Sequence, residues 1–333
     1  MSRDEGVVIP LRSGPTRAQQ GSERHPSAHE KADVLPFTGA PAEPDEPALR
    51  EPPAGWDQRL ADGLAFLRRR LDGDFEIDEY GFDHDFAETI ELPALRALYE
   101  RWFRVEVNGI ENVPATGAAL LVANHAGGLW PLDAAMTSVA VRLEHPAGRY
   151  LRPLAADLLF GVPGVGTLAR RGGATLACQD DAERLLKAGE LVGVWPEGFK
   201  GIGKLYRDRY RLRRFGRGGF VRSAISAGVP IVPVSIVGSE ETHPMLGNAR
   251  TLARLLNLPY FPLTPTFPWL GPLGLVPLPS KWYIEFGAPL RTDELAAGTA
   301  DDPRAVFELT DQVRDRIQTT LYRLLAQRGS IWR

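Results

Sequence analysis

Short apolar runs alternate with helical patterns in the C-terminal two thirds of the chain. Strands are indicated where hydrophobic positions recur with period two or form a short buried run. The predicted strands are WFRVEVNGI (102–110), AALLVANH (118–125), LVGVW (191–195), IVPVSIVG (231–238) and WYIEFG (282–287). Helices are predicted between them, among them DDAERLLKAG (180–189) and FVRSAISAG (220–228). This alternation predicts one α/β domain with a mostly parallel or mixed sheet flanked by helices.

The regions on either side of this domain divide the chain into four parts. Residues 1–55 are rich in Pro, Ala and charge, which predicts a disordered tail. N-terminal helices are expected over 56–101, with one of them running from about Phe86 to Trp102, and the domain itself over 102–290. The last part, 291–333, contains a long helix whose apolar positions share one face. In helix 180–189 we expect Asp180 or Asp181 as N-cap and Gly189 at the C-terminal stop.

The first N-terminal helix carries one apolar stripe. Its members recur at helical spacing, and they are Trp56, Leu60, Leu64, Leu67 and Leu71. Three arginines (68–70) follow at its C-terminal end, where cations complement the helix dipole. The stripe has two interpretations: a helix that packs on the domain, which we favour, or a helix that lies on a membrane surface.

Composition narrows the class of protein. The chain has 333 residues, 44% of them hydrophobic, which is ample for a buried core. Its formal charge of −3 gives no global basic field for nucleic acid. The single cysteine, Cys178, excludes an intrachain disulfide and a cysteine zinc site. No secretory signal and no apolar run long enough to span a bilayer is present, so we expect a cytoplasmic protein.

His125 is the strongest candidate for chemistry among the six histidines. It stands where a predicted buried strand ends, and the C-terminal ends of parallel strands are where α/β proteins bind ligands. An imidazole can take a proton from a hydroxyl near neutral pH when a carboxylate fixes its tautomer, and Asp133 is the nearby carboxylate. The alternative is that Asn124 and His125 close a turn while Asp133 caps the next helix. This segment alone leaves both interpretations open.

The segment WPEGFKGIGK (195–204) follows another predicted strand. Its GFKGIGKL part matches the spacing of a nucleotide phosphate loop, but Leu205 stands where that loop needs Ser or Thr, which disfavours an NTPase. A basic run follows, interrupted only by Asp208: Lys200, Lys204, Arg207, Arg209, Arg211, Arg213, Arg214 and Arg217. Such a run either solvates a surface or binds an anion such as phosphate. Nucleic acid is a weaker candidate because no nucleic-acid-binding motif accompanies the run.

Three segments in fixed order resemble the motifs of a known family. NHAGGLWPLD (124–133), WPEGFKG (195–201) and VPIVPV (229–234) are similar to N-H-x-x-x-x-D, F-P-E-G-T-R and V-P-[IV]-[VI]-P-V of the glycerolipid acyltransferases of the lysophosphatidic acid acyltransferase type. The resemblance covers about 102–289. It implies an enzyme that moves a fatty acyl group from acyl-CoA, or acyl-carrier protein, to a glycerolipid hydroxyl such as that of lysophosphatidic acid. It also implies no metal and no bound cofactor.

The resemblance assigns roles to particular residues. His125 is expected to be the base and Asp133 the carboxylate that orients it. Glu197 and Gly198 would belong to an acceptor loop shaped by Pro196, and the backbone N–H groups near Gly127 are candidate donors to the oxyanion. The expected substrate-binding residues are Asn124, Gly127, Gly128, Glu197, Gly198, Lys200 and Lys204.

The chain departs from the family pattern in three places. Seven residues separate His125 from Asp133, where the family motif has four, so a loop must return the carboxylate to the ring. Lys200 stands where the family has Arg. Gln179 lies near the position of the family's second-motif Arg, for which Arg170 and Arg171 are possible substitutes. A neutral acylglycerol acceptor and a non-catalytic lipid-binding protein on the same fold therefore remain alternatives.

A Pro-rich aromatic segment, NLPYFPLTPTFPWLGPLGLVPLPSKW (257–282), has Lys281 as its only formal charge. It is too rich in Pro for a membrane-spanning helix. It is either a shallow aromatic platform at a membrane surface or a Pro-stiffened loop packed over the core. Its aromatic residues are Tyr260, Phe261, Phe267, Trp269 and Trp282. With the platform, the protein would associate peripherally with the cytoplasmic face of a membrane, and its partners would be the acyl donor, the glycerolipid and the membrane surface.

Overall fold

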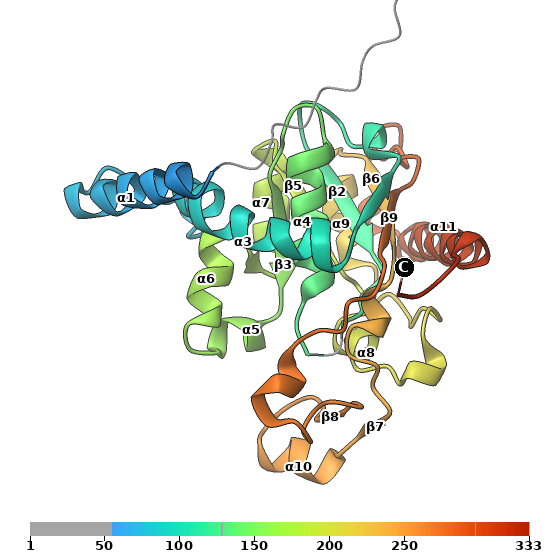
Figure 1. The fold of residues 1–333 in the computed structure, drawn as a ribbon. Coiled ribbons are helices and arrows are strands. Elements are labelled where there is room, and N and C mark those ends of the chain that lie inside the picture. Colours follow the sequence, from blue (N-terminus) through green and yellow to red (C-terminus); the bar gives the residue numbers. More distant parts are fainter. Residues whose placement is uncertain (1–54, 128, 297, 333) are drawn as a thin grey trace, which may run out of the picture. The chain divides into compact units, whose positions relative to one another are not determined.

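The computed structural model of this chain describes residues 55–127, 129–296 and 298–332. The segment predicted to be a disordered tail (1–55) lies outside these residues, except for Gly55. Figure 1 labels the helices and strands of the described part.

Seven strands form one sheet in the order β1-β9-β6-β2-β5-β3-β4. They are β1 (Glu106–Asn108), β2 (Ala119–Ala123), β3 (Leu151–Ala155), β4 (Thr175–Leu176), β5 (Leu191–Val194), β6 (Ile231–Val237) and β9 (Tyr283–Phe286). Neighbouring strands are parallel except β6 and β9, which are antiparallel. A separate antiparallel pair joins β7 (Gly247–Asn248) to β8 (Pro262–Leu263). The predicted α/β fold with a mostly parallel or mixed sheet is confirmed.

Helices connect and flank these strands. The α-helices are α1 (Trp56–Asp72), α2 (His84–Phe86), α3 (Leu92–Ala97), α4 (Leu132–Glu144), α5 (Asp157–Gly161), α6 (Val165–Arg171), α7 (Gln179–Lys187), α8 (Phe199–Ile202), α9 (Gly219–Ala227), α10 (Arg250–Leu255) and α11 (Pro303–Gln327). The π-helical turn η1 (Ala87–Glu91) joins α2 to α3, and a second one, η2 (Leu98–Trp102), extends α3 to Trp102, which gives the single helical stretch that the sequence predicts. The short 3₁₀ turns are η3 (Ile110–Asn112), η4 (Tyr206–Asp208), η5 (Ser239–Glu241), η6 (Gly271–Leu275) and η7 (Thr299–Asp301).

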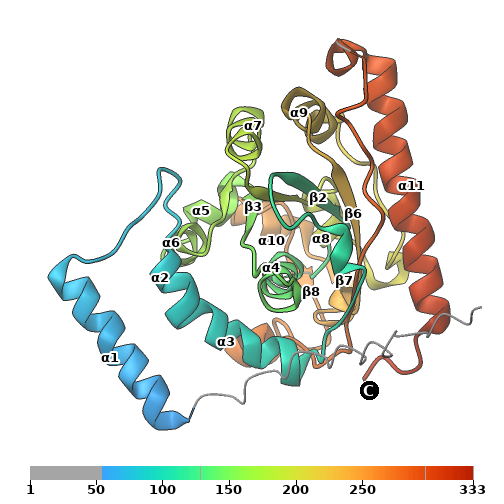
Figure 2. The same cartoon turned by 90° about the horizontal axis from the view of Figure 1, so that it is seen from above.

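Helices lie on both faces of the sheet, as Figure 2 shows. Along β2, Ala119, Leu121 and Ala123 belong to one apolar cluster, which includes α4 and the helical stretch before β1. The intervening Leu120 and Val122 belong to a second cluster, with α7, α9 and α11. This alternation follows from the two-residue period of a strand. It explains why the central strands read as continuous hydrophobic runs in the sequence.

The expected N-cap of helix α7 is wrong, although its C-terminal stop is right. Cys178 occupies the N-cap position, while Asp180 and Asp181 lie in the first turn. Carboxylates there still favour the helix, because they face the positive end of its dipole. Gly189 has a φ of +90°, a left-handed backbone that glycine adopts without strain.

The favoured interpretation of the α1 stripe is also wrong. All five apolar side chains of the stripe are exposed, from 56% for Leu60 to 87% for Leu71. The helix is held by its arginines instead: Arg70 Nη2 lies 2.6 Å from Asp83 Oδ1, and Arg69 pairs with Asp85. The stripe therefore does not pack on the domain.

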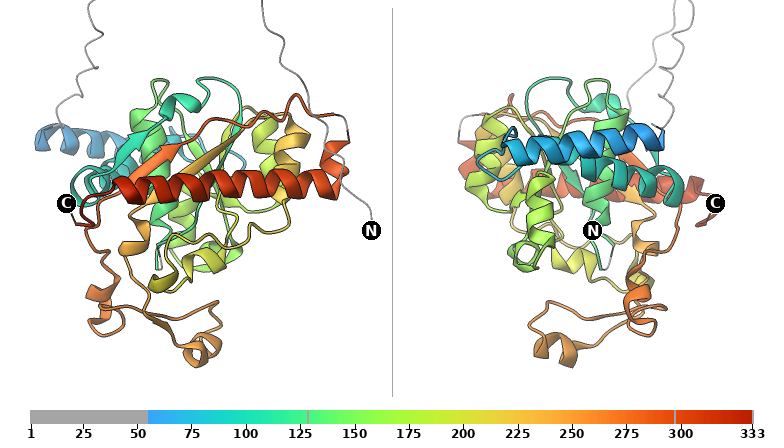
Figure 3. Two further views of the ribbon diagram at one scale, coloured as in Figure 1. Left: turned by 90° about the vertical axis from the view of Figure 1, so that its right-hand side faces the viewer. Right: turned by 60° about the vertical axis from the view of Figure 1, so that its left-hand side comes forward.

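Residues 244–280, called the apolar lobe below, contain β7, α10, β8 and η6 and extend away from the sheet in both views of Figure 3. The lobe exposes large apolar side chains at positions Leu246, Leu252, Leu255, Leu256, Leu258, Trp269, Leu270, Leu273 and Val276. Across the described residues, no helix is both long and apolar enough to cross a membrane.

Candidate active site

Three adjacent parallel strands end at one edge of the sheet. β2 lies between β6 and β5, and its partners run parallel to it. Asn124 and His125 follow β2, the segment 195–197 follows β5, and Gly238 begins the segment after β6. The carboxyl ends of parallel strands form the edge at which α/β proteins bind ligands. The two segments that carry the candidate residues, after β2 and after β5, therefore meet the segment after β6 where such a site is expected.

His125 and Asp133 are in direct contact. His125 Nδ1 lies 2.6 Å from Asp133 Oδ2, and the Asp133 side chain is fully buried while that of His125 is 15% exposed. The carboxylate also accepts the backbone N–H groups of Ala126 and Ala134, each at 2.9 Å. A carboxylate facing Nδ1 holds the ring proton there, which leaves the Nε2 lone pair to act as a base. The arrangement can orient an imidazole for proton transfer.

The seven-residue loop between them returns the carboxylate to the ring. Gly127 has a φ of +130°, and a Cβ at this position would lie 2.8 Å from the Trp130 carbonyl oxygen. Only glycine fits that backbone. Asp133 then lies in the first turn of α4, which begins at Leu132. Gly128, the other predicted loop glycine, lies outside the described residues.

Asn124 fixes the end of β2. Its side-chain Nδ2 donates to the Ile236 carbonyl at 3.0 Å, and its Oδ1 accepts the Ile236 N–H at 2.7 Å. Both polar atoms are thus used by the backbone of β6. The structure gives Asn124 a positioning role for His125, in place of the predicted contact with substrate.

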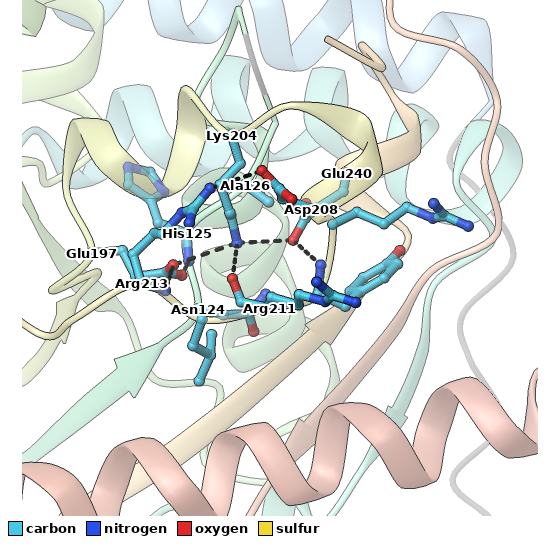
Figure 4. Close-up of polar contacts among 12 residues, drawn as sticks. Asn124, His125, Ala126, Glu197, Lys204, Asp208, Arg211, Arg213 and Glu240 are labelled. Carbon is cyan, nitrogen blue, oxygen red and sulfur yellow. Dashed lines mark hydrogen bonds and ion pairs between the residues drawn. The ribbon is translucent and has the colours of Figure 1, made fainter. Parts of the chain in front are cut away.

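Glu197 and Lys204 are buried and bonded within the protein, as Figure 4 shows. Glu197 Oε1 accepts the His125 backbone N–H at 3.0 Å, and Oε2 accepts the Arg213 backbone N–H at 2.6 Å. Lys204 Nζ lies 3.4 Å from Glu197 Oε2 and 3.1 Å from Glu240 Oε1. A buried ammonium group needs such partners. The expectation that these two residues bind the acceptor is therefore corrected: they brace the segment beneath His125.

The polar network continues to the C-terminal helix. Burial raises the pKa of Glu240 to about 7, against an opposing effect from Lys204. Tyr210 donates its hydroxyl to Glu241, whose other oxygen lies 3.1 Å from Arg328 Nη1. Burial raises the pKa of the Tyr210 phenol well above its usual value. None of these four residues was identified from the sequence. The signal for Glu240 and Glu241 is the polar SEE (239–241), which follows the predicted buried strand 231–238.

Gly198 and Lys200 remain at the surface beside His125. Both are exposed, and Gly201 packs so closely that a Cβ there would lie 2.8 Å from the His125 carbonyl oxygen. The arginines of the basic run are exposed as well: Arg207, Arg209, Arg211, Arg213, Arg214 and Arg217. Arg213 pairs with Asp208 at 3.1 Å. A basic surface thus borders the segment that contacts His125.

Gln179, Arg170 and Arg171, which lie near the expected second motif, contact side chains outside the His125 site. Gln179 begins α7 and donates to Glu183 Oε1 at 2.9 Å. The guanidinium carbons of Arg170 and Arg171 lie 4.3 Å and 5.8 Å from phenylalanine ring centroids. Within the described residues, no group of three or more His, Cys, Asp or Glu side chains is placed to hold a metal ion.

Tyr260 reaches the site from the apolar lobe. Its ring packs against Gly203, where an added Cβ would lie 3.3 Å from Tyr260 Cδ1. Burial, and after it the negative charge of Asp133, raises the pKa of the Tyr260 phenol. Tyr260 is thus half-buried, which at this position favours the packed loop over the surface platform.

Comparisons with known proteins identify similar sequences and one family model. A family model described as Acyltransferase matches residues 104–237. An uncharacterized protein of Mycobacterium tuberculosis is 59% identical over 275 residues, which are 83% of this chain and 76% of that protein. A human protein named DGAT1/2-independent enzyme synthesizing storage lipids is 25% identical over 224 residues, 66% of each chain.

The solved structures include a more distant likeness. The crystal structure of the 1-acyl-sn-glycerophosphate acyltransferase PlsC from Thermotoga maritima aligns with a TM-score of 0.47 at 18% identity, covering 80% of this chain and 97% of that one. The family model carries the assignment, and its range contains all three motifs. The chain belongs to the acyltransferase family whose model matches residues 104–237.

Proposed function

We propose that this protein transfers a fatty acyl group from acyl-CoA, or acyl-carrier protein, to a hydroxyl of a glycerolipid such as lysophosphatidic acid. The observation that carries the proposal is the 2.6 Å contact between His125 Nδ1 and Asp133 Oδ2 at the C-terminal edge of the sheet. His125 Nε2 takes the proton of the acceptor hydroxyl while the oxygen of that hydroxyl attacks the thioester carbonyl. The C–S bond then breaks, and the thiolate that leaves takes the proton from His125.

Direct transfer is favoured over a covalent acyl-enzyme. The chain has no G-x-S-x-G elbow to present a serine. Its single cysteine, Cys178, caps α7, and burial raises the pKa of its thiol, which lowers the thiolate fraction. A nucleophile other than the acceptor hydroxyl is therefore not supported.

The direct assay is thiol release from acyl-CoA in the presence of a mixed pool of lysolipids and acylglycerols, with lipid products identified by mass. We expect CoA release that depends on the acceptor, together with a matching acylated glycerolipid. Lipid binding without thiol release would instead support the non-catalytic alternative on the same fold.

We propose a phosphorylated acceptor, because the exposed basic surface borders the segment that contacts His125. Replacing Lys200 and Arg207 with Glu should raise the KM for lysophosphatidic acid about three- to tenfold, and that for acyl-CoA much less, since exposed ion pairs contribute at most about 1 kcal/mol each. Added salt should weaken the wild-type preference. Arg304→Glu, on the exposed surface of α11, is the matched control and should change neither value.

A neutral acylglycerol is the competing acceptor. Gln179 is uncharged and lies near the position where the family has Arg, and the human relative is named for storage-lipid synthesis. If wild type and the charge-reversed variant acylate monoacylglycerol or diacylglycerol at the same rate, the phosphorylated acceptor is refuted in favour of the neutral one.

We also propose that the apolar lobe binds a membrane surface. Trp269 is 71% exposed and Leu273 72% exposed, whereas Trp282, predicted to share this surface, is fully buried. Phe261 and Phe267 stack on each other with ring centroids 5.5 Å apart. Residues 269–276 therefore expose the large apolar side chains that can contact lipid, and the one indole group among them, that of Trp269, suits the headgroup level.

Trp269→Ser combined with Leu273→Ser should weaken binding to liposomes by about ten- to a hundredfold, because shallow insertion gives each side chain about half of the roughly 1.5–3 kcal/mol that full burial contributes. Vesicle flotation measures the effect, and Leu64→Ser with Leu67→Ser on the exposed α1 stripe is the comparison. If the lobe variant floats as well as wild type and the α1 variant does not, α1 is the anchor and the lobe is not.

A further inference from the structure

Two side chains from different segments bind one carbonyl group of the apolar lobe. Trp130 Nε1 donates to the Leu275 carbonyl oxygen at 3.0 Å, and His243 Nε2 lies 3.2 Å from the same oxygen. The other ring nitrogen of His243, Nδ1, lies 3.2 Å from the Gly127 carbonyl oxygen. His243 is 3% exposed. Gly127 and Trp130, at two points of the loop between His125 and Asp133, are thus both tied to the lobe.

The two contacts differ in character. Burial lowers the pKa of His243, and a neutral imidazole has one N–H to donate. It can therefore donate to Gly127 or to Leu275, but not to both at once. The Trp130 indole is a donor in every state of the protein. Trp130 supplies the constant bond to Leu275, and His243 supplies an exchangeable one.

This chain has a particular need for such contacts. Its His125-to-Asp133 loop has seven residues, three more than the family motif, and a longer loop has more conformations to restrict. Asp133 can orient His125 only when the loop is closed. Hydrogen bonds from outside the loop reduce the number of open conformations.

The carbonyl that receives both contacts lies beside lipid-facing positions. Leu273 and Val276, on either side of Leu275 in the chain, are 72% and 49% exposed. A lipid surface that covers Leu273 and Val276 would restrict the backbone on both sides of Leu275. It would thereby restrict the Leu275 carbonyl that Trp130 and His243 contact. Restricting the backbone at the outer face of the lobe would therefore also restrict the loop between His125 and Asp133, through these hydrogen bonds.

We propose that Trp130 and His243 are positioning residues that fix the His125 loop to the Leu275 carbonyl, so that lipid contact on the apolar lobe raises the turnover of His125. This inference rests on the proposed acyl transfer and on lipid binding by the lobe. It adds a route by which a lipid surface acts on catalysis itself, beyond concentrating the substrates.

The experiment separates turnover from substrate delivery. A water-soluble short-chain lysophosphatidic acid is used as acceptor with acyl-CoA, and kcat is measured with and without substrate-free phospholipid vesicles. Wild type should show a higher kcat with vesicles. Trp130→Phe, which removes the N–H and keeps an aromatic ring, should lower that stimulation by about two- to tenfold, the factor expected for one lost hydrogen bond. Vesicle binding and the KM for acyl-CoA should stay unchanged.

The chain offers a matched control. Trp102 Nε1 donates to the Pro277 carbonyl at 2.9 Å, so Trp102→Phe removes the same kind of bond to the same lobe from outside the loop. That variant should keep the stimulation, while His243→Gln, a second test in the contact itself, should reduce it. Equal stimulation in wild type and Trp130→Phe, equal losses in the Trp102 and Trp130 variants, or no stimulation of an active wild type would each overturn the inference. An inactive wild type would instead count against the proposed acyl transfer.

Discussion

Replacing His125 with alanine is expected to lower kcat for acyl transfer by about 10²- to 10⁴-fold, the usual effect of removing a general base. The protein should stay folded, because the buried Asp133 carboxylate keeps two backbone N–H donors after the ring is lost. Thiol release from acyl-CoA measures the rate, and circular dichroism with thermal melting checks the fold.

His84→Ala is the control for this variant. His84 is exposed, and its ring lies 4.7 Å from that of Tyr150, outside the contacts that hold His125. It should retain wild-type turnover. Near-normal turnover in purified His125→Ala would show that another group is the base. Asp133→Asn should also impair turnover strongly, because an amide can hold the wrong imidazole tautomer.

The sequence predicts the contact between His125 and Asp133 well because its signals are local. The end of the buried run 119–123 places His125 at the sheet edge, and the loop glycines make the return of Asp133 plausible. Strand β3 was not predicted, because Arg152 and Pro153 interrupt its apolar pattern. Arg152 is nevertheless 2% exposed and pairs with Asp78 at 2.8 Å. A buried charge of this kind depends on a partner that is distant in the chain.

The roles of Lys204 and Glu197 could not be read from the sequence for the same reason. Lys204 looks like a member of a basic run, yet the carboxylate nearest to it belongs to Glu240, 36 residues further along. Only the fold brings β6 next to β2 and so places Glu240 beneath the site. A charged residue in a segment with a loop pattern is predicted to be exposed to solvent. Here the tertiary contacts of Lys204 bury it instead.

Apolar periodicity has a related limit. The stripe on α1 and the face of α11 have the same helical spacing, but the first is exposed while Val313, Ile317 and Leu321 of the second are fully buried. Periodicity identifies the face of a helix and leaves open what covers it. The aromatic segment shows the same limit, because Trp269 is exposed and Trp282 is buried within 14 positions of each other.

Replacing Lys204 with methionine is expected to cost about 3–5 kcal/mol of unfolding free energy at pH 8, the usual loss when one partner of a buried ion pair is removed. The side chains of Glu197 and Glu240 are 0% and 7% exposed, so their charges would be left without the ammonium that contacts both. Denaturant unfolding followed by fluorescence measures the loss.

This loss should shrink as the pH falls. The pKa of Glu240 is raised to about 7 in the folded protein, above its ordinary value of 4.5, so the folded state binds this proton more tightly than the unfolded state does. The stability that comes with the proton is present at low pH and is lost as the pH rises through about 7. Removing Lys204 raises that pKa further, because a positive charge no longer favours the carboxylate. The difference between variant and wild type should therefore be largest at pH 8 and much smaller at pH 5.5.

Lys187→Met provides the comparison for a surface pair. Lys187 is 59% exposed and lies 3.6 Å from Glu183 on α7, so its loss should cost less than about 1 kcal/mol at both pH values. An equal loss at pH 5.5 and pH 8 for Lys204→Met would contradict the uncompensated-carboxylate explanation. A stable Lys204→Met protein with a raised KM for lysophosphatidic acid alone would contradict the buried role itself and would return Lys204 to the acceptor site.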